Sequence, residues 1–557
     1  MTAIYDIASE YVDAISALDP ISATGMGVPG HDAEMTDFSP EGVAAHSALR
    51  RETLAKLAAA AVTGDRDRVA KEAMEDVISL REEVVAAGDQ YRLSGFRNAT
   101  TTIRMAFDLM PRATEEDWAN IAARLALVPQ GVASFRVSLE EGLRKGIPSA
   151  RRQVAQAIKQ SATYAGDDGT KSFFHGLLDA FDASGVASAA LRTELEAGAG
   201  LAAGAFSGFS SYLSEKFMDR AVEKDGVGRE LYQLSSRVYN GVELDLEATY
   251  QWGWDELYRI EDEMRKTCAK ILPGASIQET KDFLETDPTR AIDGVEEFRQ
   301  WMQDTQDRTI AELSGVHFDI PEPLKKIEAM IAPPGGSLAM YYTSPSEDFS
   351  RPGRTWYPTG GKTRFPLWGE VSIAYHEGVP GHHFERATAK YLAAELSRFQ
   401  RLMGGTSGYV EGWALYAERL MGELGYLENP DYYLGMLRAQ AMRAVRVIVD
   451  IGMHLDLRIP ASEAFHGGET WTADLGQEFC LQRSQFPPDF MQSEVIRYLG
   501  TPGQAISYKV GERCWLEARE ASRRRQGDAF SLKDWHRAAL NLGPMGLAQM
   551  QRELARI

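Results

Sequence analysis

Three of the ten histidines of this chain lie within eleven residues, YHEGVPGHHFE (375–385), and a Pro-Gly pair separates the first histidine from the other two. Pro380 has no backbone N–H to donate, and Gly381 tolerates dihedral angles that other residues avoid. A helix that served only for packing would have no reason to contain this pair. The stretch therefore predicts a helix that is distorted between the first histidine and the second.

The same stretch predicts a metal site. A hydrolytic zinc site has three protein ligands, an open position for water and a carboxylate that can take a proton from that water. In HExxH proteins the two histidines lie one helical turn apart, and the glutamate between them is the general base. Here His376 and Glu377 match the first half of that pattern, but the next histidine follows only six or seven residues later.

The long spacing requires an explanation. On a straight helix His383 would lie roughly 10 Å from His376 along the axis, which is too far for two ligands of one ion at about 2 Å. A bulge at residues 379–381 removes the excess. Looping out two residues brings His382 into the second ligand position, and looping out three brings His383 there. We expect His382, with His383 as the alternate.

The third ligand is expected on a neighbouring helix. After the loop GGTSG (404–408) comes a helical segment with Glu411 near its start, twenty-nine residues beyond His382. This spacing suits a helix, a turn and a second helix that returns antiparallel to the first. We expect one zinc ion held by His376, His382 and Glu411, with Glu377 as the general base.

The rest of the chain predicts a mostly α-helical fold. Apolar residues recur at three- and four-residue spacing, with breaks rich in glycine and proline. The segment 328–367 differs, because 338–342 and 354–357 predict a short β-hairpin just upstream of the histidines. We expect one large, continuous, two-lobed body: an N-terminal helical region over 1–240, a catalytic helical region over 241–557, and the hairpin or a short sheet near the cleft.

Composition excludes several classes of partner. Eighty acidic against sixty basic residues give a formal charge of -20, which disfavours nucleic acid and anionic membrane surfaces. No run of about 18 apolar residues predicts a membrane span, and the first twenty residues do not resemble a secretion signal. Three widely spaced cysteines predict no disulfide framework. We expect a cytoplasmic protein with a small peptide-like substrate; the sequence leaves the oligomeric state open.

Three blocks carry a resemblance to a known family. HEGVPGHHFE (376–385), EGWALYAERL (411–420) and EVIRYLGTPGQAISYKVGE (494–512) resemble signature blocks of DUF885, a bacterial family described as a domain of unknown function. MPRATEEDW near residue 110 and SRPGRTWY near residue 350 extend the resemblance over most of the chain. Membership implies a largely helical protein with a metallopeptidase-like site.

A more distant similarity is to the helical gluzincin peptidases of the angiotensin-converting-enzyme and thermostable-carboxypeptidase type. Those families pair HExxH with a glutamate about one helical hairpin later, and the first has an Ile-Arg-Tyr-Phe stretch whose tyrosine steadies the tetrahedral intermediate. IRYL at 496–499 resembles this stretch, which implies that Tyr498 supports the oxyanion. The displaced second histidine is a departure from the pattern, and so is Pro487-Pro488 where a histidine would precede the tyrosine.

Arginines near these blocks are candidates for substrate binding, because a guanidinium can grip the terminal carboxylate of a peptide. We expect Arg354, Arg446 and Tyr508 in this role, and the hairpin edge can pair with an extended peptide. The resulting hypothesis is a zinc metallopeptidase, carboxypeptidase- or dipeptidase-like. The alternatives are a catalytically inactive helical protein that binds a metal or a peptide, and a hydrolase of non-peptide amides or esters.

Overall fold

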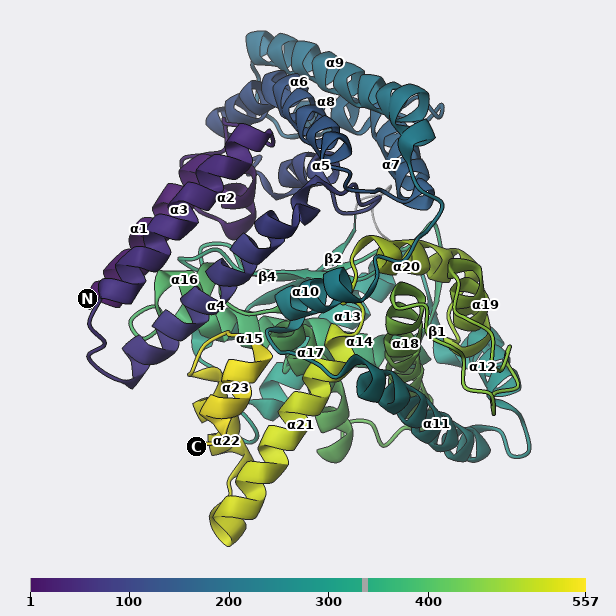
Figure 1. Ribbon diagram of the computed structural model, residues 1–557. Helices are drawn as coiled ribbons and strands as arrows, with labels where there is room; N and C mark the ends of the chain where they lie inside the picture. The colour runs from purple at the N-terminus through teal and green to yellow at the C-terminus, as the bar shows by residue number, and fades with distance from the viewer. Residues whose placement is uncertain (1, 333–338) are drawn as a thin grey trace. The chain divides into compact units, whose positions relative to one another are not determined.

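The computed structural model describes residues 2–332 and 339–557 (Figure 1). Helices make up most of these residues and are accompanied by two small sheets, which confirms the mostly α-helical class. The chain divides into two compact units. Unit 1 comprises Met1–Thr63, Ile78–Val227 and Ile496–Thr501, and unit 2 comprises Gly64–Val77, Gly228–Val495 and Pro502–Ile557. The predicted division between residues 240 and 241 falls inside unit 2.

Unit 1 is built of helices. In chain order they are α1 (Ala3–Leu18), α2 (Pro20–Met26), α3 (Pro40–Ala59), the second part of α4 (Asp65–Ala87), η1 (Asp89–Tyr91), α5 (Ala99–Leu109), α6 (Glu115–Arg144), α7 (Arg151–Ala165), α8 (Phe173–Ala183), α9 (Ala189–Tyr212), η2 (Leu213–Phe217) and η3 (Met218–Arg220).

The long helix α6 shows why these segments are helical. Thr114 precedes it as an N-cap: its hydroxyl accepts the N–H of Asp117, and the Asp117 carboxylate accepts the N–H of Thr114, a reciprocal capping box. Helix α6 packs along α9 (Figure 1). Their apolar faces meet in a core that contains Trp118, Leu125 and Phe206, so unit 1 has a hydrophobic core of its own.

Unit 2 contains the histidine stretch. Its elements after the first part of α4 are α10 (Arg229–Asn240), α11 (Leu246–Ile271), α12 (Ile277–Thr286), η4 (Pro288–Arg290), β1 (Ala291–Asp293), α13 (Val295–Leu313), η5 (Glu322–Lys325), β2 (Ile327–Ile331), β3 (Tyr341–Thr343), β4 (Gly353–Tyr357), β5 (Arg364–Pro366), η6 (Leu367–Gly369), α14 (Glu370–Glu377), α15 (His382–Tyr391), α16 (Arg398–Leu402), α17 (Ser407–Glu423), α18 (Pro430–His454), α19 (Ala473–Arg483), the first part of α20 (Pro488–Gly500), α21 (Ser507–Gln526), η7 (Gly527–Ala529), α22 (Leu532–Leu540) and α23 (Leu547–Leu554).

The predicted β-hairpin is confirmed. β3 pairs with β4 in antiparallel register, with Tyr342 opposite Thr355, while residue 338 of the prediction lies outside the described residues. β2 adds to the other side of β4 in parallel register, so among the described strands the order is β2-β4-β3, with β3 at an edge. β1 and β5 form a second, antiparallel pair. Neither β2 nor the β1-β5 pair was predicted, because short strands with distant partners leave little local signal.

Helix α18 is the most buried element of unit 2. All residues from Ala439 to His454 are buried, and α11 packs along the helix. Inside it, Asp450 accepts hydrogen bonds from the Tyr232 hydroxyl at 2.9 Å and from the Gly503 N–H at 2.9 Å. The Nε2 atom of His454 lies 3.6 Å from the same carboxyl group. These polar groups therefore tie three segments of unit 2 together.

Two sequence expectations concern features spread along the chain. Cys268, Cys480 and Cys514 are buried and form no disulfide, as predicted. Among the helices of the described residues, none has the length and apolar character needed to cross a membrane.

Candidate metal centre

The helix is interrupted where the sequence predicts. Helix α14 ends at Glu377 and α15 begins at His382, and the Val379-Pro380 peptide bond between them is cis. The N–H of Gly381 donates to the carbonyl of Tyr375 at 3.0 Å, and a side chain at Gly381 would overlap the backbone of the preceding turn. The predicted distortion is confirmed. It brings the rings of His376 and His382 to 4.7 Å between centroids.

Three predicted ligands meet beside this break. Glu411 Oε2, in the first turns of α17, lies 3.5 Å from His376 Nε2 and 3.3 Å from His382 Nε2. On a tetrahedron with bonds of about 2.0–2.1 Å, ligand atoms are separated by about 3.3 Å. Two imidazole nitrogens and a carboxylate oxygen are also a ligand set that zinc accepts. The residues present therefore fit a zinc ion in both spacing and chemistry.

Glu377 lies against the same group of ligands. A side-chain oxygen of Glu377 lies within 4.8 Å of a ring nitrogen of His376 and one of His382. The side chain is buried, and its Oε2 has no hydrogen-bond partner among the described residues. A buried carboxylate oxygen that is left open next to a ligand set is placed to act on a water molecule there.

Electrostatics favour a positive charge at this point. Burial opposes the charged form of His376, but contacts with Glu411 and Glu418 raise the pKa of its ring to about 9. Burial also opposes charge on Glu411, yet His382 and His376 hold the pKa of that carboxyl well below its usual range. These residues stabilise a proton where the three ligand atoms meet, and a divalent cation competes for the same position.

Glu418 is a functional candidate that the sequence reasoning missed. Its Oε1 lies 2.8 Å from His376 Nδ1, and the contact is buried. When Nδ1–H donates to this carboxylate, the lone pair of Nε2 faces the ligand position. Glu418 follows Glu411 by seven residues on α17, so both side chains share one helix face. That spacing in EGWALYAERL was the available signal.

His383 has a different environment from His382. Burial lowers the pKa of the His383 ring to about 4, so the ring is neutral. Its Nε2 lies 2.8 Å from the carbonyl of Leu324, which requires Nε2–H as the donor, and its Nδ1 accepts from the Tyr342 hydroxyl at 2.9 Å. Both nitrogens are thus engaged away from Glu411. The structure brings His382, and not the alternate His383, to the ligand set.

Helix α17 also holds the helix break in place. The indole N–H of Trp413 donates to the carbonyl of Pro380 at 2.8 Å. A side chain at Gly412 would overlap the backbone of Gly511, so α17 and α21 approach each other closely directly behind Glu411. One helix therefore carries the candidate ligand Glu411, supports His376 through Glu418 and anchors the segment that leads to His382.

Of the predicted substrate residues, Tyr508 lies beside the candidate centre, and Arg446 lies beside Tyr508. The Tyr508 ring is nearly parallel to that of His376, with an interplanar angle of 17° and 6.4 Å between centroids. The Arg446 guanidinium lies 4.6 Å from the Tyr508 centroid and pairs with Glu494 at 2.7 Å. Arg354 instead forms an ion pair with Glu328 across β4 and β2 at 2.7 Å, so its partner belongs to the sheet.

Tyr498 is fully buried on α20, with the Arg497 guanidinium 5.0 Å from its ring centroid. It belongs to the segment Ile496–Thr501, which groups with unit 1. The role that the resemblance implies for Tyr498 stays a prediction.

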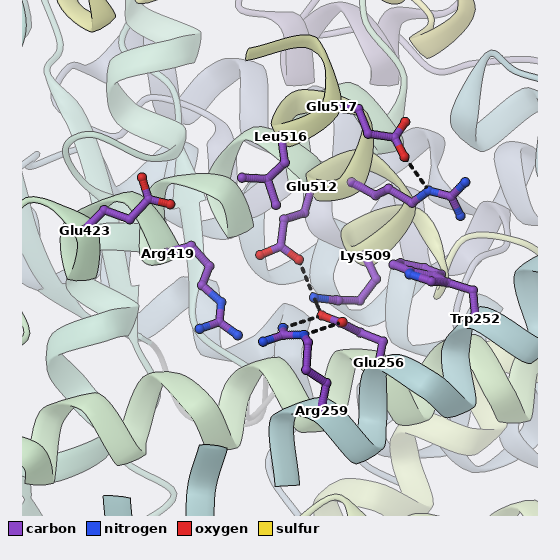
Figure 2. Close-up of a pocket in the computed structure, with 10 residues that line it drawn as sticks. Trp252, Glu256, Arg259, Arg419, Glu423, Lys509, Glu512, Leu516 and Glu517 are labelled. Atoms are coloured by element: carbon purple, nitrogen blue, oxygen red, sulfur yellow. Dashed lines mark hydrogen bonds and ion pairs between the residues drawn. The ribbon is translucent and has the colours of Figure 1, made fainter. Parts of the chain in front are cut away.

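A charged pocket of about 390 Å³ opens between α11, α17 and α21 (Figure 2). Lys509 lies between Glu256 and Glu512 in Figure 2, and its Nζ donates to Glu256 at 2.7 Å and to Gln440 at 2.8 Å. Arg419, also in the lining, pairs with Glu263 outside it. Because these charged side chains are paired with one another, we interpret them as groups that stabilise the packing of the helices.

Comparisons with known proteins support the fold. A crystal structure from Colwellia psychrerythraea, described as a "putative lipoprotein", matches with a TM-score of 0.85 and 22% identity over 100% of this chain and 99% of that one. A "putative lipoprotein of unknown function" from Shewanella oneidensis matches with a TM-score of 0.73 and 17% identity, covering 99% of each chain. At these identities the likeness shows a shared fold.

A search of curated proteins finds no match. These comparisons do not test the more distant similarity to gluzincin peptidases, which stays a prediction. A family model described as "Bacterial protein of unknown function (DUF885)" matches residues 20–554, nearly the whole chain. The resemblance found in the sequence blocks is thereby confirmed, and the chain belongs to the DUF885 family.

Proposed function

We propose that this chain is a zinc-dependent hydrolase that cleaves peptide bonds of small or extended peptides, a metallopeptidase of the carboxypeptidase or dipeptidase type. One observation carries the proposal. His376 Nε2 and His382 Nε2 lie 3.5 and 3.3 Å from Glu411 Oε2, and the buried carboxylate of Glu377 lies beside them. Two imidazoles, one ligand carboxylate and one free carboxylate are the parts of a hydrolytic zinc site.

Each residue has a distinct task in this proposal. Zinc, when bound, supplies Lewis acidity that polarises a substrate carbonyl and makes water more acidic. Glu377 takes a proton from the attacking water on its open carboxylate oxygen and delivers it to the departing amine. Glu418 keeps His376 in the tautomer that directs Nε2 toward the ligand position.

The sheet supplies a way to align a peptide. β3 is an edge strand, and the ring of its Tyr342 lies 6.5 Å from that of His382 at an interplanar angle of 20°. A peptide that pairs its backbone with an edge strand is held extended. Pairing with β3 would therefore lead a substrate past His382. Tyr498 is retained as the oxyanion-supporting residue on the strength of the resemblance alone.

Metal analysis combined with an activity assay tests the proposal. Wild-type protein purified without chelators is expected to hold one zinc ion and to cleave members of a panel of di- and tripeptides. His376→Ala is expected to lose the ion. Glu377→Gln is expected to keep the ion and lose cleavage by about 100-fold or more, in line with removal of a general base.

His466→Ala serves as the matched control, because this half-exposed histidine pairs with Glu469. It should keep both metal and activity. Wild-type protein that binds no zinc contradicts the proposal. Zinc binding without any Glu377-dependent cleavage would instead support the inactive metal- or peptide-binding protein.

The cytoplasmic location expected from the sequence stays a prediction. Two proteins of the same fold are described as "putative lipoprotein", and a membrane-anchored location is therefore the alternative for this chain. Fractionation of the native cells, with detection of this chain by antibody, distinguishes the two locations.

A further inference from the structure

Arg443 is a buried cation with open hydrogen-bond donors. It lies on α18 and is 5% exposed. Its Nη2 lies 3.5 Å from Glu418 Oε1, but Nε and Nη1 have no hydrogen-bond partner within the described part of the chain. Burying charged donors without acceptors is costly. These donors therefore indicate a ligand that the chain itself does not supply.

The surroundings place this cation beside the metal centre. Arg443 and Arg446 are three residues apart on α18, and their guanidinium carbons lie 5.5 and 4.6 Å from the centroid of the Tyr508 ring. That ring lies next to His376 and is partly exposed. A substrate group that contacts the Tyr508 ring is thus separated from His376, a candidate metal ligand, by that one ring.

The charges around Tyr508 specify the kind of ligand. Glu494 pairs with Arg446, whereas the ion-pair contact of Arg443 with the described residues is a long one, to Glu418, which already binds His376 at 2.8 Å. Two guanidinium groups beside one ring attract an anion, and a planar carboxylate matches parallel N–H donors. The ring faces of Tyr508 attract the two cations but accept no directed hydrogen bond of comparable strength.

On the basis of the proposed function, we propose that Arg443 and Arg446 form a carboxylate-binding subsite beside the metal centre, and that the substrates carry a free carboxylate close to the bond that is cleaved. The α-carboxylate of a C-terminal residue is the favoured source, because only one extended residue separates it from the preceding peptide bond, a span of about 3.3–3.6 Å. An acidic side chain presents the same chemistry.

Binding to a non-cleaving protein tests the subsite separately from catalysis. Zinc-loaded Glu377→Gln protein is titrated calorimetrically with three probes: Ala-Phe as the free acid, Ala-Phe amide, and Ala-Glu amide. We expect the free acid to bind about 10- to 100-fold more tightly than its amide. Adding Arg443→Gln should abolish this preference. Adding Arg443→Lys should reduce the preference, because lysine keeps the charge opposite Glu418 but lacks the parallel N–H donors of a guanidinium.

Arg513→Gln is the matched control, since it removes one positive charge from an exposed position of α21 where Arg513 pairs with Glu517. It should leave the preference intact. If Ala-Glu amide binds as tightly as the free acid, the subsite accepts a side-chain carboxylate as well as an α-carboxylate. Equal binding of the free acid and both amides would overturn the subsite, and so would an Arg443→Gln variant that weakens acid and amide alike, because Arg443 would then act only through Glu418.

The outcome is separable from that of the proposed function. An acid preference that depends on Arg443, in a protein whose wild type cleaves no peptide, would retain the subsite and reject the peptidase. Cleavage by the wild type with no acid preference would retain the peptidase and reject the subsite.

Discussion

His382 and His383 are adjacent in the sequence, yet their rings serve different parts of the structure. The ring of His382 faces Glu411, and that of His383 connects β3 to the segment before β2 through Tyr342 and Leu324. A loop of two or of three residues would each have satisfied the sequence spacing. The hydrogen bonds of His383 are what separate the two solutions.

We predict opposite effects for the two histidines. His382→Asn should lower zinc affinity at least 100-fold with little loss of stability, because it removes a ligand. His383→Asn should retain zinc but destabilise the fold by about 1–3 kcal/mol, because the buried Tyr342 hydroxyl and Leu324 carbonyl lose their hydrogen-bond partner. Zinc stoichiometry and the midpoint of thermal unfolding measure both effects. Loss of zinc in His383→Asn alone would show that the assignment is reversed.

Glu370, in the first turn of α14, is a second residue whose environment decides its chemistry. Burial raises the pKa of its carboxyl to about 7, against the opposing charges of Arg438 and Lys362 and with Glu285 adding to the shift. Its Oε2 has no hydrogen-bond partner among the described residues. The folded protein thus binds a proton here more tightly than the unfolded chain does.

The sign of the resulting pH dependence follows from this raised pKa. Between about pH 4.5 and pH 7 the folded state holds the proton while the unfolded state releases it, so stability falls as pH rises through this window. Glu370→Gln should match the wild type at pH 5 and be more stable by about 2–3 kcal/mol at pH 8. Glu296→Gln is the control, as this first-turn glutamate of α13 is paired with Arg299 on the surface. Denaturant unfolding at both pH values measures the difference. Equal effects at pH 5 and pH 8 would contradict the prediction.

At the scale of elements, the contact between α17 and α21 sets the position of a ligand. Gly412 follows Glu411, and the backbones of Gly412 and Gly511 touch because neither carries a side chain. Any methyl group at this crossing must push the two helices apart. The candidate metal centre therefore depends on a helix contact that involves none of its candidate ligands.

We predict that Gly412→Ala lowers both the free energy of unfolding, by about 1–3 kcal/mol, and the affinity for zinc, because Glu411 moves with its helix. Gly422→Ala is the matched control on the same helix. There a new Cβ would lie 3.4 Å from the Tyr433 ring, and alanine has the higher helix propensity. It should leave zinc affinity unchanged. Chemical unfolding and zinc titration test the pair, and equal zinc affinity in wild type and Gly412→Ala would refute the coupling.

For the whole molecule, the division into two units predicts a local response to the metal. Every candidate ligand belongs to unit 2, and a ligand stabilises the structure that binds it, by about 2.7 kcal/mol at 100 times its dissociation constant. Hydrogen exchange measured with and without zinc should therefore slow in α15 and α17. Helices α6 and α9 of unit 1, which have their own core, should exchange at unchanged rates. Equal slowing in both units would show that they unfold as one.

The sequence by itself determined the class of fold and named most residues of the candidate centre. Helical periodicity, the Thr114 N-cap and the break at Pro380-Gly381 are local properties of the chain, so they were readable without coordinates. The same holds for His376, Glu377 and Glu411, whose residue types and spacing follow a known ligand pattern. The β3-β4 hairpin was also readable, because its strands are close in sequence.

Tertiary structure alone decided the rest. The choice between His382 and His383 depended on Leu324 and Tyr342, far from both in sequence. Glu418 became a candidate only when α17 brought it to the first histidine, and the contact between Arg443 and Glu418 likewise arose from the packing of α18. The parallel pairing of β2 with β4 likewise joins segments without a local turn. Such contacts arise from packing between elements that are distant in the sequence. This packing produces no periodic pattern of residues that a single sequence could reveal.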